Sequence, residues 1–146
     1  MLENRGAFSC AGGKPKESKD GLSFMVIGAG IDIIEVSRVQ KASERTGFLE
    51  RIFTNKEKQY FERMNFNPQT IAGMFAAKEA IAKALAVGFN GVKWRDIEIL
   101  HDEKGAPYTS LACGALDRMN ELSGKRVLVS ISHIKELAVA QAILED

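Results

Sequence analysis

The 146-residue sequence lacks several features that would point to particular classes of protein. Its two cysteines, Cys10 and Cys113, do not have the spacing of zinc ligands or of a disulfide framework, so we expect a reducing, cytoplasmic location. It has no hydrophobic run long enough for a membrane span or a signal peptide, and membrane association is not expected. Lys plus Arg total 20 and Asp plus Glu total 19, and this balance does not favour nucleic acid as a partner. Any anion must therefore be bound by a local site.

Hydrophobic patterning begins near residue 25. Residues 1–24 are rich in Gly, Lys and Ser and have no apolar period, which predicts a disordered extension or a tag. The length of the remainder fits one domain over residues 25–146.

The most strongly patterned stretch covers residues 67–88, NPQTIAGMFAAKEAIAKALAVG. Asn67 is placed as an N-cap and Pro68 as the first helical residue, and we expect the helix to stop at Gly88. Three charged residues interrupt this apolar helix. Lys78 falls in the middle of the bulky face, while Glu79 and Lys83 lie one turn apart at its border. Buried charges need an opposite charge, a metal or a ligand, although a solvated Glu79–Lys83 pair with a snorkelling Lys78 would also satisfy this pattern.

A second informative stretch is residues 24–36, FMVIGAGIDIIEV, which predicts a buried strand with one acidic residue, Asp32. A carboxylate among isoleucines must face a cation or a hydrogen-bond donor to remain charged, unless it is a capping residue at the strand end. In the later strand RVLVSISH, His133 continues the apolar face of the strand. Such a histidine is either structural or a rigidly held base or phosphate donor.

The remaining patterns give the order of elements. Helices are expected over residues 37–46, 55–64 (with a Thr54 to Glu57 capping box) and 112–122, and strands over residues 94–100, 108–111 and the last two segments. This order favours an α+β fold with helices packed on one face of an antiparallel sheet.

Three separated segments resemble one known family. They are GIDI at residues 30–33, FAAKEA at residues 75–80 followed by Lys83, and SISH at residues 130–133. In this order and spacing they closely resemble the holo-[acyl-carrier-protein] synthases, the small trimeric type of 4'-phosphopantetheinyl transferase. The resemblance covers the chain from about Met25 to its C-terminus.

The resemblance implies transfer of 4'-phosphopantetheine from coenzyme A to a serine of apo acyl carrier protein, leaving adenosine 3',5'-bisphosphate. It implies that Asp32 and Glu79 hold magnesium, and that Lys83 contacts the departing phosphate. The base for the serine proton could be Glu79, a metal-bound water or His133. It also implies a homotrimer with active sites shared between neighbouring subunits, and we expect the partner of Lys78 at that subunit boundary.

Further binding residues follow from the same resemblance. Coenzyme A is expected to contact Lys83, Gly88, Pro107, Ser132 and His133, and Arg38 is expected to contact the acidic carrier protein.

Two loops depart from the family pattern. The usual Gly-Thr-Gly after the helix is Ala86-Val87-Gly88, and the usual Gly-Lys-Pro is Gly105-Ala106-Pro107. These changes leave two alternatives to a transferase: a relative that binds coenzyme A or carrier protein without turnover, and a purely structural trimeric scaffold.

Overall fold

The computed structural model describes residues 24–88 and 91–146. Apart from Phe24, the predicted extension lies outside these residues. The elements follow the order β1 (Val26–Glu35), α1 (Val36–Ser43), α2 (Phe48–Ile52), α3 (Asn55–Arg63), α4 (Pro68–Ala84), the 3-10 helix η1 (Trp94–Asp96), β2 (Ile97–His101), β3 (Pro107–Leu111), α5 (Cys113–Glu121), β4 (Arg126–His133) and β5 (Leu137–Glu145).

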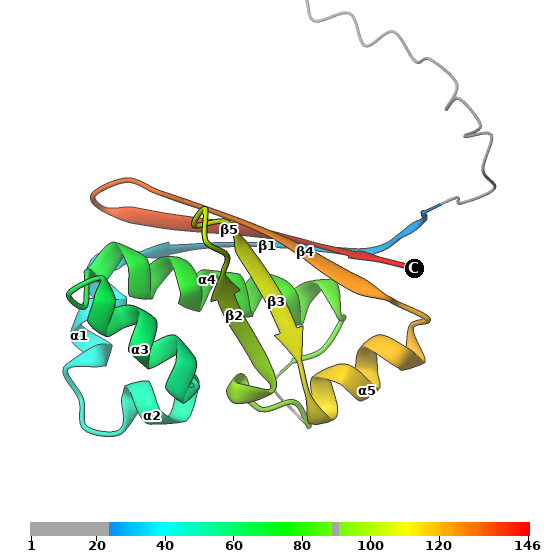
Figure 1. Ribbon diagram of the computed structural model, residues 1–146, viewed down its shortest axis with the longest axis horizontal. Helices are drawn as coiled ribbons and strands as arrows, with labels where there is room; N and C mark the ends of the chain where they lie inside the picture. Colours follow the sequence, from blue (N-terminus) through cyan, green and yellow to red (C-terminus); the bar gives the residue numbers. More distant parts are fainter. Residues whose placement is uncertain (1–23, 89–90) are drawn as a thin grey trace, which may run out of the picture.

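Three of the strands form the layer on which the fold is built. β1, β5 and β4 make an antiparallel sheet in the order β1-β5-β4, so β1 and β4 are its two edge strands. α4 lies along one face of this sheet, with α1 to α3 at one end and α5 at the other (Figure 1). The predicted α+β class, with helices on one face of an antiparallel sheet, is confirmed.

β2 and β3 form a separate two-stranded antiparallel sheet. The strand predicted from residue 94 begins only at Ile97, because residues 94–96 form η1. The helix α2 was not predicted, and its five residues are too few to show a helical period.

α4 begins as predicted and ends earlier. Asn67 Oδ1 accepts hydrogen bonds from the backbone N–H groups of Gln69 and Thr70, at 2.9 and 3.2 Å. The helix stops at Ala84 rather than at Gly88, because Ala86 takes a left-handed conformation with φ of 51°. The N–H groups of Ala86 and Val87 then bond to the carbonyls of Lys83 and Ala82, which is a Schellman ending.

Close packing of α4 on β1 depends on two strand glycines. An added Cβ would lie 2.1 Å from the Ala84 carbonyl oxygen at Gly28, and 2.0 Å from that of Ala80 at Gly30. Both contacts are with backbone atoms, which cannot move aside as a flexible side chain would. Glycine at these positions therefore lets the helix backbone rest against the strand.

Lys78 is fully buried, and its partner lies in the same chain. Its ammonium is 2.9 Å from the carboxylate of Glu57 and donates to the backbone carbonyls of Trp94 and Ile97. The expectation of a partner at a subunit boundary was therefore wrong. Burial lowers the pKa of Lys78 and raises that of Glu57, since it penalises both charged forms.

Candidate functional site

Asp32, Glu79 and Lys83 come together in one pocket. This cavity of about 460 Å³, called here the β1 pocket, is lined by Asp32, Ile33, Ile34, Arg38, Val39, Ala42, Phe48, Phe75, Glu79 and Lys83. Asp32 is on β1, Glu79 and Lys83 are on successive turns of α4, and Arg38 is on α1. Asp32 is therefore brought into one pocket with Arg38 and with Glu79 and Lys83, which lie about fifty positions later in the sequence.

Lys83 makes the closest polar contacts in this pocket. Its ammonium lies 2.8 Å from Asp32 Oδ1 and 2.8 Å from the backbone carbonyl oxygen of Ile31. The predicted alternative of a solvated Glu79–Lys83 pair is therefore replaced by a Lys83–Asp32 pair.

Glu79 lies in an environment that favours the protonated carboxyl group. Its pKa is raised above the ordinary value, first by burial and then by the negative charge of Asp32, while the Lys83 ammonium opposes this rise. Two carboxylates that repel one another form a site that a cation would stabilise.

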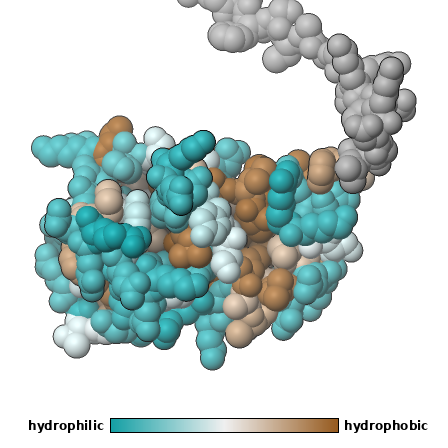
Figure 2. Space-filling model, in the orientation of Figure 1, coloured by the Kyte–Doolittle hydropathy of each residue, from teal (hydrophilic) through white to brown (hydrophobic). Residues whose placement is uncertain are grey.

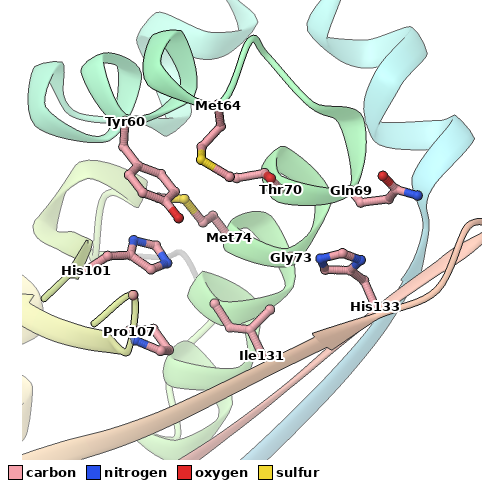
Figure 3. A pocket seen from close by; sticks show the side chains of 11 residues that line it. Tyr60, Met64, Gln69, Thr70, Gly73, Met74, His101, Pro107, Ile131 and His133 are labelled. Carbon is pink, nitrogen blue, oxygen red and sulfur yellow. The ribbon is translucent and has the colours of Figure 1, made fainter. Parts of the chain in front are cut away.

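The other predicted site residues lie in a second pocket. This cavity of about 190 Å³, called here the β4 pocket, is lined by Tyr60, Met64, Gln69, Thr70, Gly73, Met74, His101, Gly105, Pro107, Ile131 and His133. Tyr60 and His101 lie on one side of it and His133 on the other (Figure 3). Pro107 and His133 are thus brought together, but not with Asp32 and Glu79.

The two pockets flank α4 at opposite edges of the sheet. β5 separates β1 from β4, which places the two edge strands about 10 Å apart. At about 100° per residue, Gly73 and Met74 also face a different side of α4 from Glu79 and Lys83. A single subunit therefore does not bring all the predicted catalytic residues into one cavity.

Two further predicted residues line neither pocket. Ser132 is exposed and points to the opposite face of β4 from Ile131 and His133. Gly88 is exposed in the loop after α4.

Tyr60 and His101 are pocket residues that the sequence analysis did not identify. Their rings are stacked with centroids 4.0 Å apart and an interplanar angle of 6°. Burial lowers the pKa of His101, and among the described residues its Nδ1 has no hydrogen-bond partner. In the sequence, the one signal for this pair was His101, which directly follows the predicted strand 94–100.

A model of the 4'-phosphopantetheinyl transferase superfamily matches residues 28–142. The chain belongs to this superfamily. The match begins at Gly28 in β1 and includes both pockets and most of β5, so it covers every predicted site residue.

Individual members of the superfamily are similar to this chain over most of its length. A holo-[acyl-carrier-protein] synthase of Alkaliphilus oremlandii is 51% identical over 120 residues, which are 82% of this chain and 98% of the relative. The crystal structure of the synthase of Neisseria meningitidis has 31% identity and a TM-score of 0.76, covering 84% of this chain and 100% of that chain. The synthase of Bacillus anthracis, solved in complex with CoA (3',5'-ADP), has 38% identity and a TM-score of 0.69, covering 84% and 98%.

Proposed function

We propose that this protein transfers the 4'-phosphopantetheine group of coenzyme A to a serine of apo acyl carrier protein, leaving adenosine 3',5'-bisphosphate. The observation that carries the proposal is the β1 pocket, where two carboxylates and an ammonium group converge in a superfamily member. Cleavage of a phosphoanhydride needs neutralisation of the charge that develops on phosphate oxygens, and these are groups that can supply it.

The donor set of the β1 pocket fits magnesium. Asp32 and Glu79 offer only oxygen ligands, which a hard divalent cation prefers, and burial together with the negative charge of Asp32 raises the pKa of Glu79. Among residues 24–88 and 91–146, no group of three or more His, Cys, Asp or Glu side chains could hold a metal ion. Two carboxylates, with water and coenzyme A phosphates completing the shell, would hold the ion, and the ion would neutralise charge on the pyrophosphate.

The protein side chains then have separate tasks. Lys83 contacts the departing phosphate and neutralises its charge. Glu79 accepts the proton of the serine hydroxyl through water. His133 is the second candidate for this base.

Coenzyme A is proposed to span two subunits. Lys83 and Gly88 contact it from the subunit that supplies the β1 pocket, while Pro107, Ser132 and His133 contact it from a neighbour. The support is the separation of Lys83 from Pro107 and His133 into two pockets on opposite sides of α4. Sharing of one site between subunits would bring the two sets of side chains together.

A homotrimer would also cover the outer face of the three-stranded sheet. Ile31 and Ile33 of β1 and Leu128 of β4 are 62%, 64% and 44% exposed on this face, opposite to α4. Figure 2 shows mostly hydrophilic surface over α1 to α3 and hydrophobic side chains gathered on the other half of a view in which the sheet is seen edge-on. Exposed aliphatic side chains on a sheet face are typical of a subunit interface.

Arg38 is proposed as a contact for acyl carrier protein. It is exposed and lines the β1 pocket beside Asp32 and Glu79. An acidic carrier protein bound to α1 would therefore present its serine next to the proposed metal ligands.

We also propose that residues 25–146 form one catalytic domain and that the protein acts in the cytoplasm. None of the helices in the described part of the chain is long and apolar enough to cross a membrane.

The function is tested by incubating the full chain with coenzyme A, Mg²⁺ and an apo acyl carrier protein. We expect the intact mass of the carrier protein to rise by one phosphopantetheine group, with adenosine 3',5'-bisphosphate released in equal amount. A chelator should stop both changes. No mass gain with several carrier proteins, while coenzyme A still binds, would instead support the relative without turnover.

A further inference from the structure

The contact between Lys83 and Asp32 does not fit the tasks assigned to these two residues. Lys83 is expected to contact the pyrophosphate, yet its ammonium is bonded to Asp32 Oδ1 and to the Ile31 carbonyl oxygen, each at 2.8 Å. Asp32 is expected to hold a metal, yet one of its oxygens is taken by an ammonium group. If this contact persisted, a metal would have only the other Asp32 oxygen and would lie beside an ammonium group, which repels a second cation.

The exposures of the two side chains indicate which of them moves. The side chain of Lys83 is 51% exposed, while that of Asp32 is 17% exposed. Asp32 lies within a ten-residue strand that is paired along its length with β5, whereas the long lysine side chain extends from α4 into an open pocket. Lys83 can therefore change rotamer without any movement of the backbone.

The contact is not needed to hold α4 against β1. The backbone of α4 already rests on Gly28 and Gly30, where any added Cβ would collide with the Ala80 or Ala84 carbonyl. A partly exposed ion pair contributes little to stability in comparison with such packing. The Lys83–Asp32 contact lies in the β1 pocket, which indicates a role in ligand binding rather than in stability.

We propose that Lys83 is an exchangeable counter-ion of Asp32. In the free protein its ammonium occupies the carboxylate, and when the divalent cation enters with coenzyme A, Lys83 moves from Asp32 to the pyrophosphate. This inference rests on the proposed function, because it takes Asp32 and Glu79 as the metal ligands.

Two consequences follow from the exchange. Lys83 opposes metal binding to the free protein, because it competes for Asp32 and places a second positive charge beside the incoming ion. Coenzyme A removes this competition by giving Lys83 another anion, so metal and coenzyme A strengthen each other's binding through Lys83.

The test measures Mn²⁺ binding to the full chain, by the electron paramagnetic resonance signal of free Mn²⁺, with and without coenzyme A. Without coenzyme A, Lys83→Met is expected to bind Mn²⁺ about 2- to 5-fold more tightly than the wild type, on the scale of a partly exposed charge contact. Lys83→Gln serves as a second variant in case Lys83→Met folds poorly. Coenzyme A should then increase Mn²⁺ affinity more in the wild type than in either variant.

Three control variants accompany this measurement. Lys83→Arg keeps a cation beside Asp32 and should stay near the wild-type affinity. Lys125→Met removes the same charge elsewhere: the Lys125 N–H donates to the carbonyl oxygen of Glu145, which lies five residues along β5 from Ala140, the partner of Asp32. It should bind Mn²⁺ as the wild type does, and Asp32→Asn should bind it much more weakly.

The outcomes separate this inference from the proposed function. If Asp32→Asn loses Mn²⁺ but Lys83→Met and Lys83→Gln bind no more tightly than the wild type, the exchange is wrong and the metal site stands. If no form binds Mn²⁺, even with coenzyme A, the metal site and the exchange are both wrong. Tighter binding by the Lys83 variants, with no transfer to carrier protein by the wild type, would support the exchange and contradict the function.

Discussion

His101 is held in a neutral state by its surroundings. Its ring, at the end of β2, stacks on Tyr60 and lines the β4 pocket. Burial is the main cause of its lowered pKa, the positive charge of Arg63 adds to it, and Asp102 opposes it. The folded state therefore binds this proton less readily than the unfolded state does.

This shift predicts a pH dependence of stability. The contribution of His101 is complete above its unfolded pKa, about 6.5, and is lost as the pH falls from there through the lower folded pKa. His101→Phe keeps the ring stack and removes the titrating group, so the free energy of unfolding should fall less between pH 7.5 and 5 than in the wild type. Urea unfolding at several pH values measures this. Equal pH dependence in His101→Phe and the wild type would contradict the assigned environment of His101.

At the scale of single residues, the charged side chains show how much of the site the sequence could predict. Three charges on an apolar helix indicated that Lys78, Glu79 and Lys83 needed partners, and Asp32 among isoleucines indicated a strand carboxylate. The partner of Lys78 could not be identified, because Glu57 fits a capping box whether it is buried or exposed. In the structure its carboxylate both caps α3 and accepts from the Ile99 N–H at 2.9 Å.

At the scale of elements, the packing of α4 on β1 determines where the β1 pocket forms. The closest approach is at Gly30, where an added Cβ would lie 2.0 Å from the Ala80 carbonyl oxygen and 2.8 Å from the Ala84 backbone nitrogen. Gly30 is two residues from Asp32, and Ala80 follows Glu79. The separation of helix and strand at this point therefore sets the separation of the two proposed metal ligands.

Gly30→Ala is predicted to move α4 away from β1. We expect it to destabilise the fold by about 1–3 kcal/mol, the usual range for overpacking, and to slow transfer beyond the loss of folded protein. Unfolding by urea and the rate per folded molecule measure the two effects.

Gly88→Ala is the control for stability, because a Cβ there meets nothing within 4 Å. Wild-type stability in Gly30→Ala would show that the helix does not rest on the strand in this way.

The elements themselves were largely predictable where the signal is local. The Asn67 cap, the Pro68 start and the Thr54 capping box each depend on neighbouring residues, and all three are present. The end of α4 was predicted at Gly88 and was misplaced. The left-handed residue that ends a helix is usually glycine, but here it is Ala86. The strands β2 and β3 were predicted, but their separation from the three-stranded sheet was not, because which strands share a sheet depends on contacts between distant residues.

At the scale of the whole molecule, the arrangement of the sheet separates two sets of functional residues. Glu79 lies in the β1 pocket and His133 in the β4 pocket, on opposite edges of the sheet. The sequence segments indicated that both belong to one site, but their order along the chain carries no information about pockets or subunits. We propose that a site shared within a homotrimer accounts for the separation.

The most direct test measures transfer by mixed trimers of two inactive variants. Glu79→Gln and His133→Ala subunits, with different affinity tags, are co-expressed and the mixed trimers are isolated. In a cyclic trimer that contains both kinds of subunit, one of the three interfaces joins an intact β1 pocket to an intact β4 pocket. We therefore expect about one third of wild-type activity per mixed trimer, although each variant alone is strongly impaired.

Mixed trimers of Glu79→Gln and Asp32→Asn are the matched control. Both changes lie in the β1 pocket, so every interface stays defective and activity should not return. Recovery of about one third of wild-type transfer by the first mixture, and none by the second, is the predicted result. A first mixture that transfers no more phosphopantetheine than its two parent variants would contradict the shared site.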